Sequence, residues 1–158
     1  MKKIYFDNSA GDCVSVFARD AEVIQAGASI YSMPVSAKNK EYERFAQDYD
    51  IHFIFDDCVP EIDFYAVPRI DVFATDSEGG FICTVGGITD FQSEAAICYI
   101  NNDRDVYFVA ENGKKFLENI SGWKANRKIT QLVKIYASQA EAKQELEFIS
   151  VDELSSNM

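Results

Sequence analysis

Four short apolar runs separated by polar turns constrain this chain more than any other feature. The runs span 70–75, 81–85, 96–100 and 106–110. Asp, Ser and Glu followed by two glycines fill 76–80, and Asn, Asp and Arg residues fill 101–105. Asp, Asn and Ser side chains hydrogen-bond their own backbone, and glycine tolerates positive φ, so both segments are typical of hairpin turns. The pattern predicts an antiparallel β-meander.

Both faces of the predicted strands are apolar. In the last run Val106, Phe108 and Ala110 alternate with Tyr107 and Val109. A sheet with one solvated face would show polar residues at every second position. We therefore expect an α+β fold with a central antiparallel sheet. Helices should pack mainly on one face, and other segments of the same chain should partly cover the second face.

Apolar spacing predicts helices around this sheet. Asn112 is a suitable N-cap for a helix that carries Phe116, Leu117, Ile120 and Trp123, and Gly122 should end it. A second helix is predicted over 129–146. Its apolar positions follow helical periodicity: Ile129, Leu132, Val133, Tyr136 and Ala140. Upstream, the sequence predicts helices over 20–30 and 41–49, and strands at 4–6, 14–17, 51–55 and 61–67.

Length and composition indicate one domain. The chain has 158 residues, and 47% of them are hydrophobic, which suffices for a single core. We therefore treat 1–158 as one domain. No apolar run is long enough to span a bilayer, and the start lacks the apolar core of a signal peptide, so we expect a cytoplasmic protein. The cysteines have no metal-site or redox spacing and are expected to be free thiols: Cys13, Cys58, Cys83 and Cys98.

Charge is distributed unevenly along the chain. The net charge of −11 argues against direct binding of nucleic acid or of an anionic membrane. Residues 41–111 contain 16 acids and three arginines, a formal charge of −13, whereas 112–138 carries six bases and one acid, a formal charge of +5. A basic protein is the partner that this pattern favours, and a simple solvated surface is the alternative.

Catalytic and metal-binding motifs are absent from the sequence. His52 is the only histidine and lies in an apolar run, where a structural role is commoner than catalysis. No glycine-rich phosphate loop and no calcium-loop pattern is present, so we expect no cofactor and no metal. Asp56 and Asp57 could serve as a carboxylate pair, but neighbours on a strand point to opposite faces.

A binding surface is the remaining candidate. The turns carry carboxylates with few basic neighbours. The candidate partner-binding residues are Asp76, Glu78, Asp103, Asp105, Asp56 and Asp57. A solvated acidic face with no function is the alternative interpretation.

The central stretch resembles the SUKH superfamily. The resemblance rests on Asp-Val-Phe-Ala-Thr-Asp-Ser-Glu-Gly-Gly-Phe at 71–81, on the tyrosine strand, Asp hairpin and following strand at 97–112, and on Phe116-Leu117. It covers 69–123. The family includes the Smi/Knr-type regulators of fungal cell-wall synthesis and many bacterial proteins that neutralise polymorphic toxins.

The resemblance implies a non-enzymatic α+β domain, and in bacteria an immunity protein that binds a basic, nuclease-like toxin. The alternatives are a regulatory scaffold that uses the bases of 112–138, such as Lys124, Arg127 and Lys128, and a small carboxylate-dependent enzyme. The sequence leaves the partner and the oligomeric state open.

Overall fold

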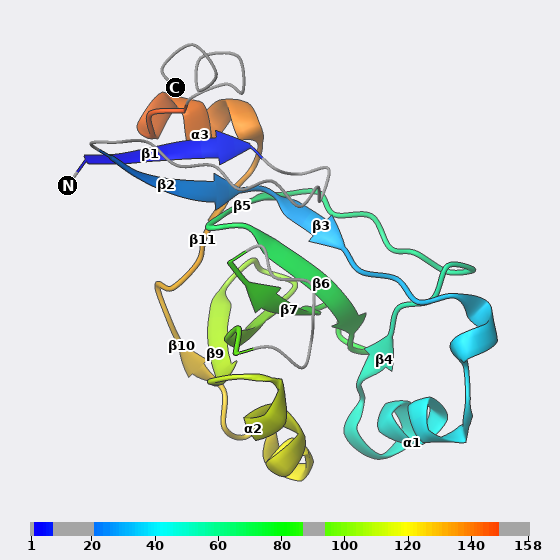
Figure 1. The fold of residues 1–158 in the computed structure, drawn as a ribbon. Coiled ribbons are helices and arrows are strands. Elements are labelled where there is room, and N and C mark those ends of the chain that lie inside the picture. The colour runs from blue at the N-terminus through cyan, green and yellow to red at the C-terminus, as the bar shows by residue number, and fades with distance from the viewer. Residues whose placement is uncertain (1, 8–20, 87–93, 149–158) are drawn as a thin grey trace.

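The predicted meander forms the centre of the molecule. The computed structural model describes residues 2–7, 21–86 and 94–148 (Figure 1). Strands β6 (Ile70–Thr75), β7 (Phe81–Val85), β8 (Ile97–Ile100) and β9 (Val106–Ala110) pair antiparallel in that order. The α+β class and the four meander strands are confirmed.

Three short strands extend the meander into a mixed, seven-stranded sheet. β10 (Lys128–Ile129) pairs antiparallel with β9 at one edge. At the other edge, β3 (Ala28–Ile30) pairs parallel with the start of β6, and β4 (His52–Phe53) pairs antiparallel with its end. The sheet is therefore not wholly antiparallel.

Helices α1 (Lys40–Tyr49) and α2 (Gly113–Glu118) cover one face of the sheet. The Asn39 side chain caps α1 by accepting from the amides of Glu41 and Tyr42. The Asn112 side chain caps α2 by accepting from the Lys115 amide, as its sequence position predicts. The buried residues under the helices are Ile51, Phe73, Ala74, Ile82, Ile97, Tyr99, Ala110, Phe116 and Trp123.

The opposite face is covered by extended chain. Phe64 and Val133 bury against Val72, Cys83 and Ile100 of the sheet. These covering segments include β5 (Tyr65–Val67) and β11 (Lys134–Tyr136), which pair antiparallel as a separate two-stranded sheet. The expectation of one helical and one chain-covered face is confirmed.

A third cluster joins the two ends of the described chain. β1 (Lys2–Asp7) and β2 (Ala21–Ala26) form a parallel pair, and α3 (Gln139–Glu145) lies over them in Figure 1. The buried members of this cluster are Ala26, Tyr65, Val67, Tyr136 and Ala142.

The helix predicted over 20–30 is wrong. Strands β2 and β3 occupy this region, and Gly27 between them has a φ of +122°, which a helix cannot accommodate. The backbone of Gly27 also bonds to two other segments, donating to the Ala66 carbonyl and accepting from the Ile70 amide. Pairing with β1 and β6 decided the structure of this region, and periodicity within one segment does not report such pairing.

The helix predicted over 129–146 is also wrong in its first half. β10 and β11 occupy that half, and only α3 is helical, beginning after its Ser138 cap. The spacing of Val133 and Tyr136 is the one a helix would show, yet both are buried by pairing and packing of extended chain. Elsewhere, the helix over 41–49 is confirmed, a 3₁₀ turn forms at Val35–Ala37, and the strand predicted at 14–17 lies outside the described residues.

The described cysteines are free thiols: Cys58 is exposed, and Cys83 and Cys98 are buried. Cys83 lies directly opposite Cys98, and burial raises the pKa of the Cys98 thiol to about 12. Cys13 lies outside the described residues. Within 2–7, 21–86 and 94–148, no helix has the length and apolarity that crossing a bilayer requires.

Candidate functional site

The two acidic turns lie side by side at one end of the sheet. The β6–β7 turn (76–80) and the β8–β9 turn (101–105) both reverse the chain at this end because the meander alternates direction. Their proximity is close: a methyl group placed on Gly79 would lie 3.4 Å from Oδ1 of Asn102. Carboxylates from two separate turns therefore share one surface.

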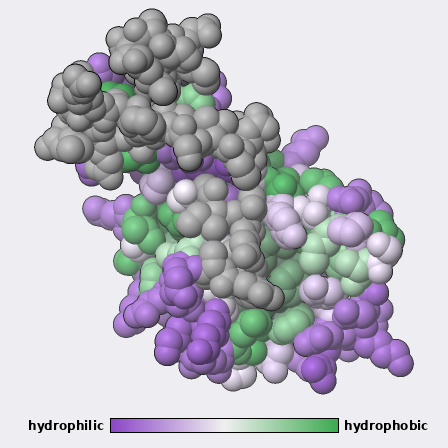
Figure 2. Space-filling model, viewed as in Figure 1, coloured by the Kyte–Doolittle hydropathy of each residue, from purple (hydrophilic) through white to green (hydrophobic). Residues whose placement is uncertain are grey.

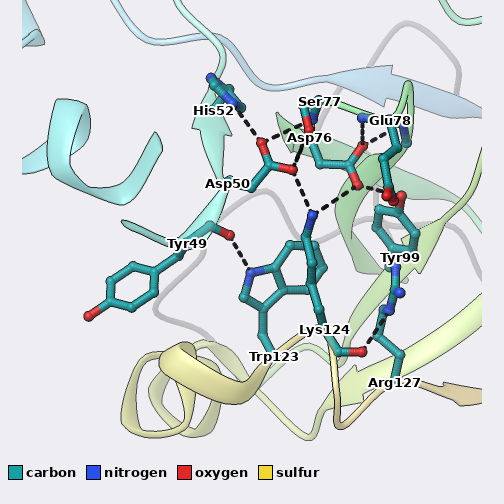
Figure 3. A network of polar contacts seen from close by, with 11 residues as sticks. Tyr49, Asp50, His52, Asp76, Ser77, Glu78, Tyr99, Trp123, Lys124 and Arg127 are labelled. Atoms are coloured by element: carbon teal, nitrogen blue, oxygen red, sulfur yellow. Dashed lines mark hydrogen bonds and ion pairs between the residues drawn. The ribbon is translucent and has the colours of Figure 1, made fainter. Parts of the chain in front are cut away.

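Asp76 holds the first turn together and is not presented to solvent. Its Oδ1 accepts from the amides of Glu78 at 3.1 Å and Gly80 at 2.7 Å, and its Oδ2 accepts from the Tyr99 hydroxyl at 2.5 Å (Figure 3). Only 7% of Asp76 is exposed. The expectation that Asp76 offers a free carboxylate to a partner is wrong, because satisfying its turn buries it.

Asn101 stabilises the second turn, and the aspartates of this turn are exposed to solvent. Oδ1 of Asn101 accepts from the amides of Asp103 at 3.0 Å and Asp105 at 2.9 Å. Arg104 adopts a positive φ of 68°, pairs with Asp63 and covers the ring of Phe64. Asp103 and Asp105 are exposed, as expected.

A small pocket of about 190 Å³ lies between the turns. Its lining residues are Glu78, Tyr99, Asn101, Asn102, Asp103, Tyr107 and Arg127. Within the described part of the chain, neither the Glu78 nor the Asp103 carboxylate makes a hydrogen bond or an ion pair. The structure thus brings together two of the six predicted residues, from different turns, as unpaired acids.

Arg127 forms one wall of this pocket, and sequence reasoning did not assign it there. Its guanidinium carbon lies 4.7 Å from the ring centroid of Tyr99, 5.6 Å from that of Tyr107 and 5.8 Å from that of Trp123. Its Nε donates to the carbonyl of Lys124 at 3.0 Å. Cation–π contacts with three rings and this bond hold the guanidinium in place.

The other three predicted residues lie elsewhere. Asp105 faces a separate, larger hollow beside Arg104 and Lys134. Asp57 pairs with Lys38, and Asp56 accepts from the Ser32 hydroxyl, both on the chain that follows β4. The six candidates therefore do not form one continuous site.

Asp50 is the centre of a polar network that was not predicted from the sequence (Figure 3). Its carboxylate accepts from Lys124 Nζ at 2.6 Å and from the Ser77 hydroxyl at 2.6 Å, and it contacts Nε2 of His52 at 2.9 Å. Burial acts to raise the pKa of Asp50, but the bonds from Lys124, Ser77 and His52 outweigh it and hold that pKa well below its usual range. The network ties α1, the first turn and the chain after Trp123 together.

The Ser77, Asp50 and His52 grouping does not have the geometry of a catalytic triad. Asp50 stands between the serine and the histidine, whereas nucleophile activation requires the histidine to contact the serine. Ser77 donates its proton to a carboxylate that Lys124 already holds. This grouping is structural. Across the residues that the structure describes, no group of three or more His, Cys, Asp or Glu side chains could hold a metal ion.

The surface around the two helices is mixed in polarity. Figure 2 shows hydrophilic residues over α1 and α2, with hydrophobic residues visible between them. No family model, curated protein or solved structure matches this chain.

Proposed function

We propose that this chain is a non-enzymatic protein-binding domain that docks a basic partner at the pocket between its two acidic turns. One observation carries the proposal: Glu78 and Asp103, from separate turns, line one pocket as unpaired acids. A buried or paired acid gains little from a new cation, whereas an unpaired one gains a charge-assisted bond. The formal charge of −13 over residues 41–111 would also steer a cationic protein toward this face.

Two of the three basic residues on which the regulatory-scaffold alternative depends already have contacts within the protein. Lys124 is bound to Asp50, and Arg127 is stacked on three rings, so neither is free to lead a contact. Lys128 remains exposed in β10. The enzyme alternative gains no nucleophile–base pair from Ser77 and His52, because both of these side chains contact Asp50.

The immunity-protein assignment is the more specific form of the same proposal. It rests on the SUKH-type order of strand, acidic turn, strand, tyrosine strand, Asp hairpin, strand and helix, with Phe116 buried under the sheet. A basic, nuclease-like toxin fits the charge of the docking face. Neutralisation would follow from occupying the toxin's phosphate-binding surface.

Affinity capture with matched variants tests the proposal. The wild-type chain, a Glu78→Gln/Asp103→Asn double variant and a Glu41→Gln/Glu43→Gln control would each be immobilised and exposed to extract of the source cells. We expect one cationic protein at near-stoichiometric yield, retained by the wild type and the α1 control and lost by the turn variant. Equal capture by all three chains would contradict the proposal.

A further inference from the structure

We propose that two copies of this chain pair along the free edge of β3, so that the central sheet continues from one copy into the other across a two-fold axis. The inference goes beyond the proposed docking function, because it uses neither of the acidic turns. It depends on three properties of the segment 28–32: its backbone groups, its lack of charge and its symmetry.

β3 lies beside β6 at one edge of the sheet (Figure 1). The Gly27 carbonyl accepts from the Ile70 amide at 3.1 Å. The Tyr31 amide donates to the Val72 carbonyl at 2.8 Å. Because backbone groups alternate in direction along a strand, three residues direct their N–H and C=O groups away from β6: Ala28, Ile30 and Ser32. Within the residues that the structure describes, these backbone groups make no hydrogen bond.

The free edge is short and has defined ends. Before it, the Gly27 amide donates to the Ala66 carbonyl at 2.7 Å. After it, the Met33 amide donates to the chain just beyond β4 at 2.9 Å, and Pro34 has no N–H to offer. Ile30 is therefore the middle one of the three residues with free backbone groups.

The segment lacks the charges that commonly protect an edge strand from pairing. Residues 23–37 contain no Asp, Glu, Lys or Arg, although such residues make up 26% of the chain. Natural proteins shorten free edges or place lysine on them, because an open edge is a template for another strand. β10, at the opposite edge, has both of these devices, since it is two residues long and one of them is the exposed Lys128. This contrast indicates that the β3 edge is used for pairing.

The free groups match those of a second copy. A two-fold axis at Ile30 sets the two segments antiparallel, and each Ile30 then exchanges both backbone bonds with its counterpart. In that register Ala28 pairs with Ser32 of the second copy, so every free group on both edges is satisfied. Tyr31, which is 45% exposed, comes to lie opposite Ser29 of the second copy and gains cover for its ring.

Charge favours a copy of this segment over a cationic partner at this edge. An uncharged edge gives a cationic protein no ion pair, whereas the equally uncharged segment of a second copy meets it without repulsion at contact. At longer range the net charge of −11 on each copy opposes association, and salt screens that repulsion. Dimerisation should therefore strengthen as salt rises, which is the opposite of docking to a cationic partner.

Sedimentation equilibrium of the full chain tests the inference. We expect a monomer–dimer equilibrium whose dissociation constant falls at least about threefold between about 0.1 M and about 1 M salt, because the screening length shortens. A chain that stays monomeric up to millimolar concentration at high salt would overturn the inference.

Lysine substitutions at the two edges locate the contact. Tyr31→Lys places a charge beside the axis on each copy and should weaken the dimer at least about tenfold. Because Tyr31 is exposed, the monomer should stay folded, which circular dichroism checks. Ile129→Lys is the matched control at the β10 edge, where Ile129 is 76% exposed, and should leave the dissociation constant unchanged. No loss from Tyr31→Lys, or an equal loss from Ile129→Lys, would contradict pairing along β3.

An engineered disulfide tests the register. Opposite residues in a hydrogen-bonded antiparallel pair have Cα atoms about 5.5 Å apart, which is within the range that a disulfide spans. In a Cys13→Ser/Cys58→Ser background, Ile30→Cys treated with oxidised glutathione should therefore give a covalent dimer on non-reducing gels, and Ile129→Cys should not. A covalent dimer from Ile129→Cys but not from Ile30→Cys would refute the proposed axis.

Discussion

Some single residues in this protein make contacts with distant segments that their neighbours in sequence do not indicate. Asp50 ends α1 in the left-handed region at a φ of 57°, and from there its carboxylate reaches Ser77 and Lys124, which are far away in the chain. The sequence shows one acid among many in 41–111. Asp50 becomes the centre of the network only because the fold brings the end of α1, the first turn and the chain after Trp123 close together.

Asp50→Asn should lower the free energy of unfolding by about 2 kcal/mol at pH 7, because charge-assisted bonds from Lys124 and Ser77 are weakened. Asparagine tolerates the left-handed conformation, so the change removes charge without adding backbone strain. Denaturant unfolding measures the difference. Asp48→Asn, on the exposed side of α1, is the control and should have almost no effect.

The same pair of variants carries a pH prediction. The folded-state pKa of Asp50 lies below its unfolded value of about 3.8, so its contribution to stability is full above that pH and is lost as pH falls further. The gap between wild type and Asp50→Asn should therefore be constant from pH 7 to 5 and narrow below about pH 4. A gap that widens in acid would contradict the assignment of the network.

Gly80 is constrained by a close approach. A methyl group at Gly80 would lie 2.2 Å from the Tyr99 hydroxyl oxygen, and that hydroxyl is buried and bound to Asp76. Gly80→Ala should cost about 3 kcal/mol, because overpacking must displace a rigid ring. At Gly122 the nearest atom is 3.4 Å away in the Asn126 side chain, so Gly122→Ala should change stability by less than about 0.5 kcal/mol. Thermal unfolding of both variants would decide.

At the scale of elements, turn chemistry predicted more than apolar periodicity did. The four meander strands were predictable because the segments 76–80 and 101–105 fix where each strand ends. The Asn112 cap located the start of α2 in the same way. The 20–30 and 129–146 regions carry helix-like spacing, but their strands pair with distant segments, and spacing within one region does not report such pairing.

Residues 132 and 133 distinguish the two structures of the later region. On the predicted helix both would lie on the buried stripe, but Val133 is 3% exposed and Leu132 is 45% exposed. Val133→Ala should lower stability by about 2 kcal/mol through the cavity it leaves, and Leu132→Ala by less than about 0.5 kcal/mol. Urea unfolding measures both. Equal losses would favour the helix.

At the scale of the whole molecule, the sequence predicted that the proposed docking face would carry acids, but it did not predict how that face is built. Glu78 and Asp103 were identifiable as turn acids, and alternating strand direction places their turns at one end. Arg127 could not be assigned, because it lies beyond α2 and is held by Tyr99 and Tyr107 of two meander strands and by the nearby Trp123. For Asp76 the sequence prediction was wrong in the opposite way. The residue was predicted to be available to a partner, but its carboxylate is occupied by the hydrogen bonds that form its own turn.

The distribution of charge predicts which substitutions change the association rate of the cationic partner and which change its dissociation rate. Acids outside the contact act at a distance, so Glu41→Gln/Glu43→Gln should slow association a few-fold at low salt and leave dissociation unchanged. Acids inside the pocket act at contact, so Glu78→Gln/Asp103→Asn should speed dissociation at least about tenfold. Surface plasmon resonance separates the two rates.

Salt supplies the control for that division. The screening length falls from about 10 Å at 0.1 M to about 3 Å at 1 M salt, so the association defect of the α1 variant should vanish at high salt. The dissociation defect of the pocket variant should remain measurable, because a bound partner would shield the pocket carboxylates from salt. A dissociation defect in the α1 variant would place the contact on α1 instead, and the pocket between the turns would then be an outlying acidic patch.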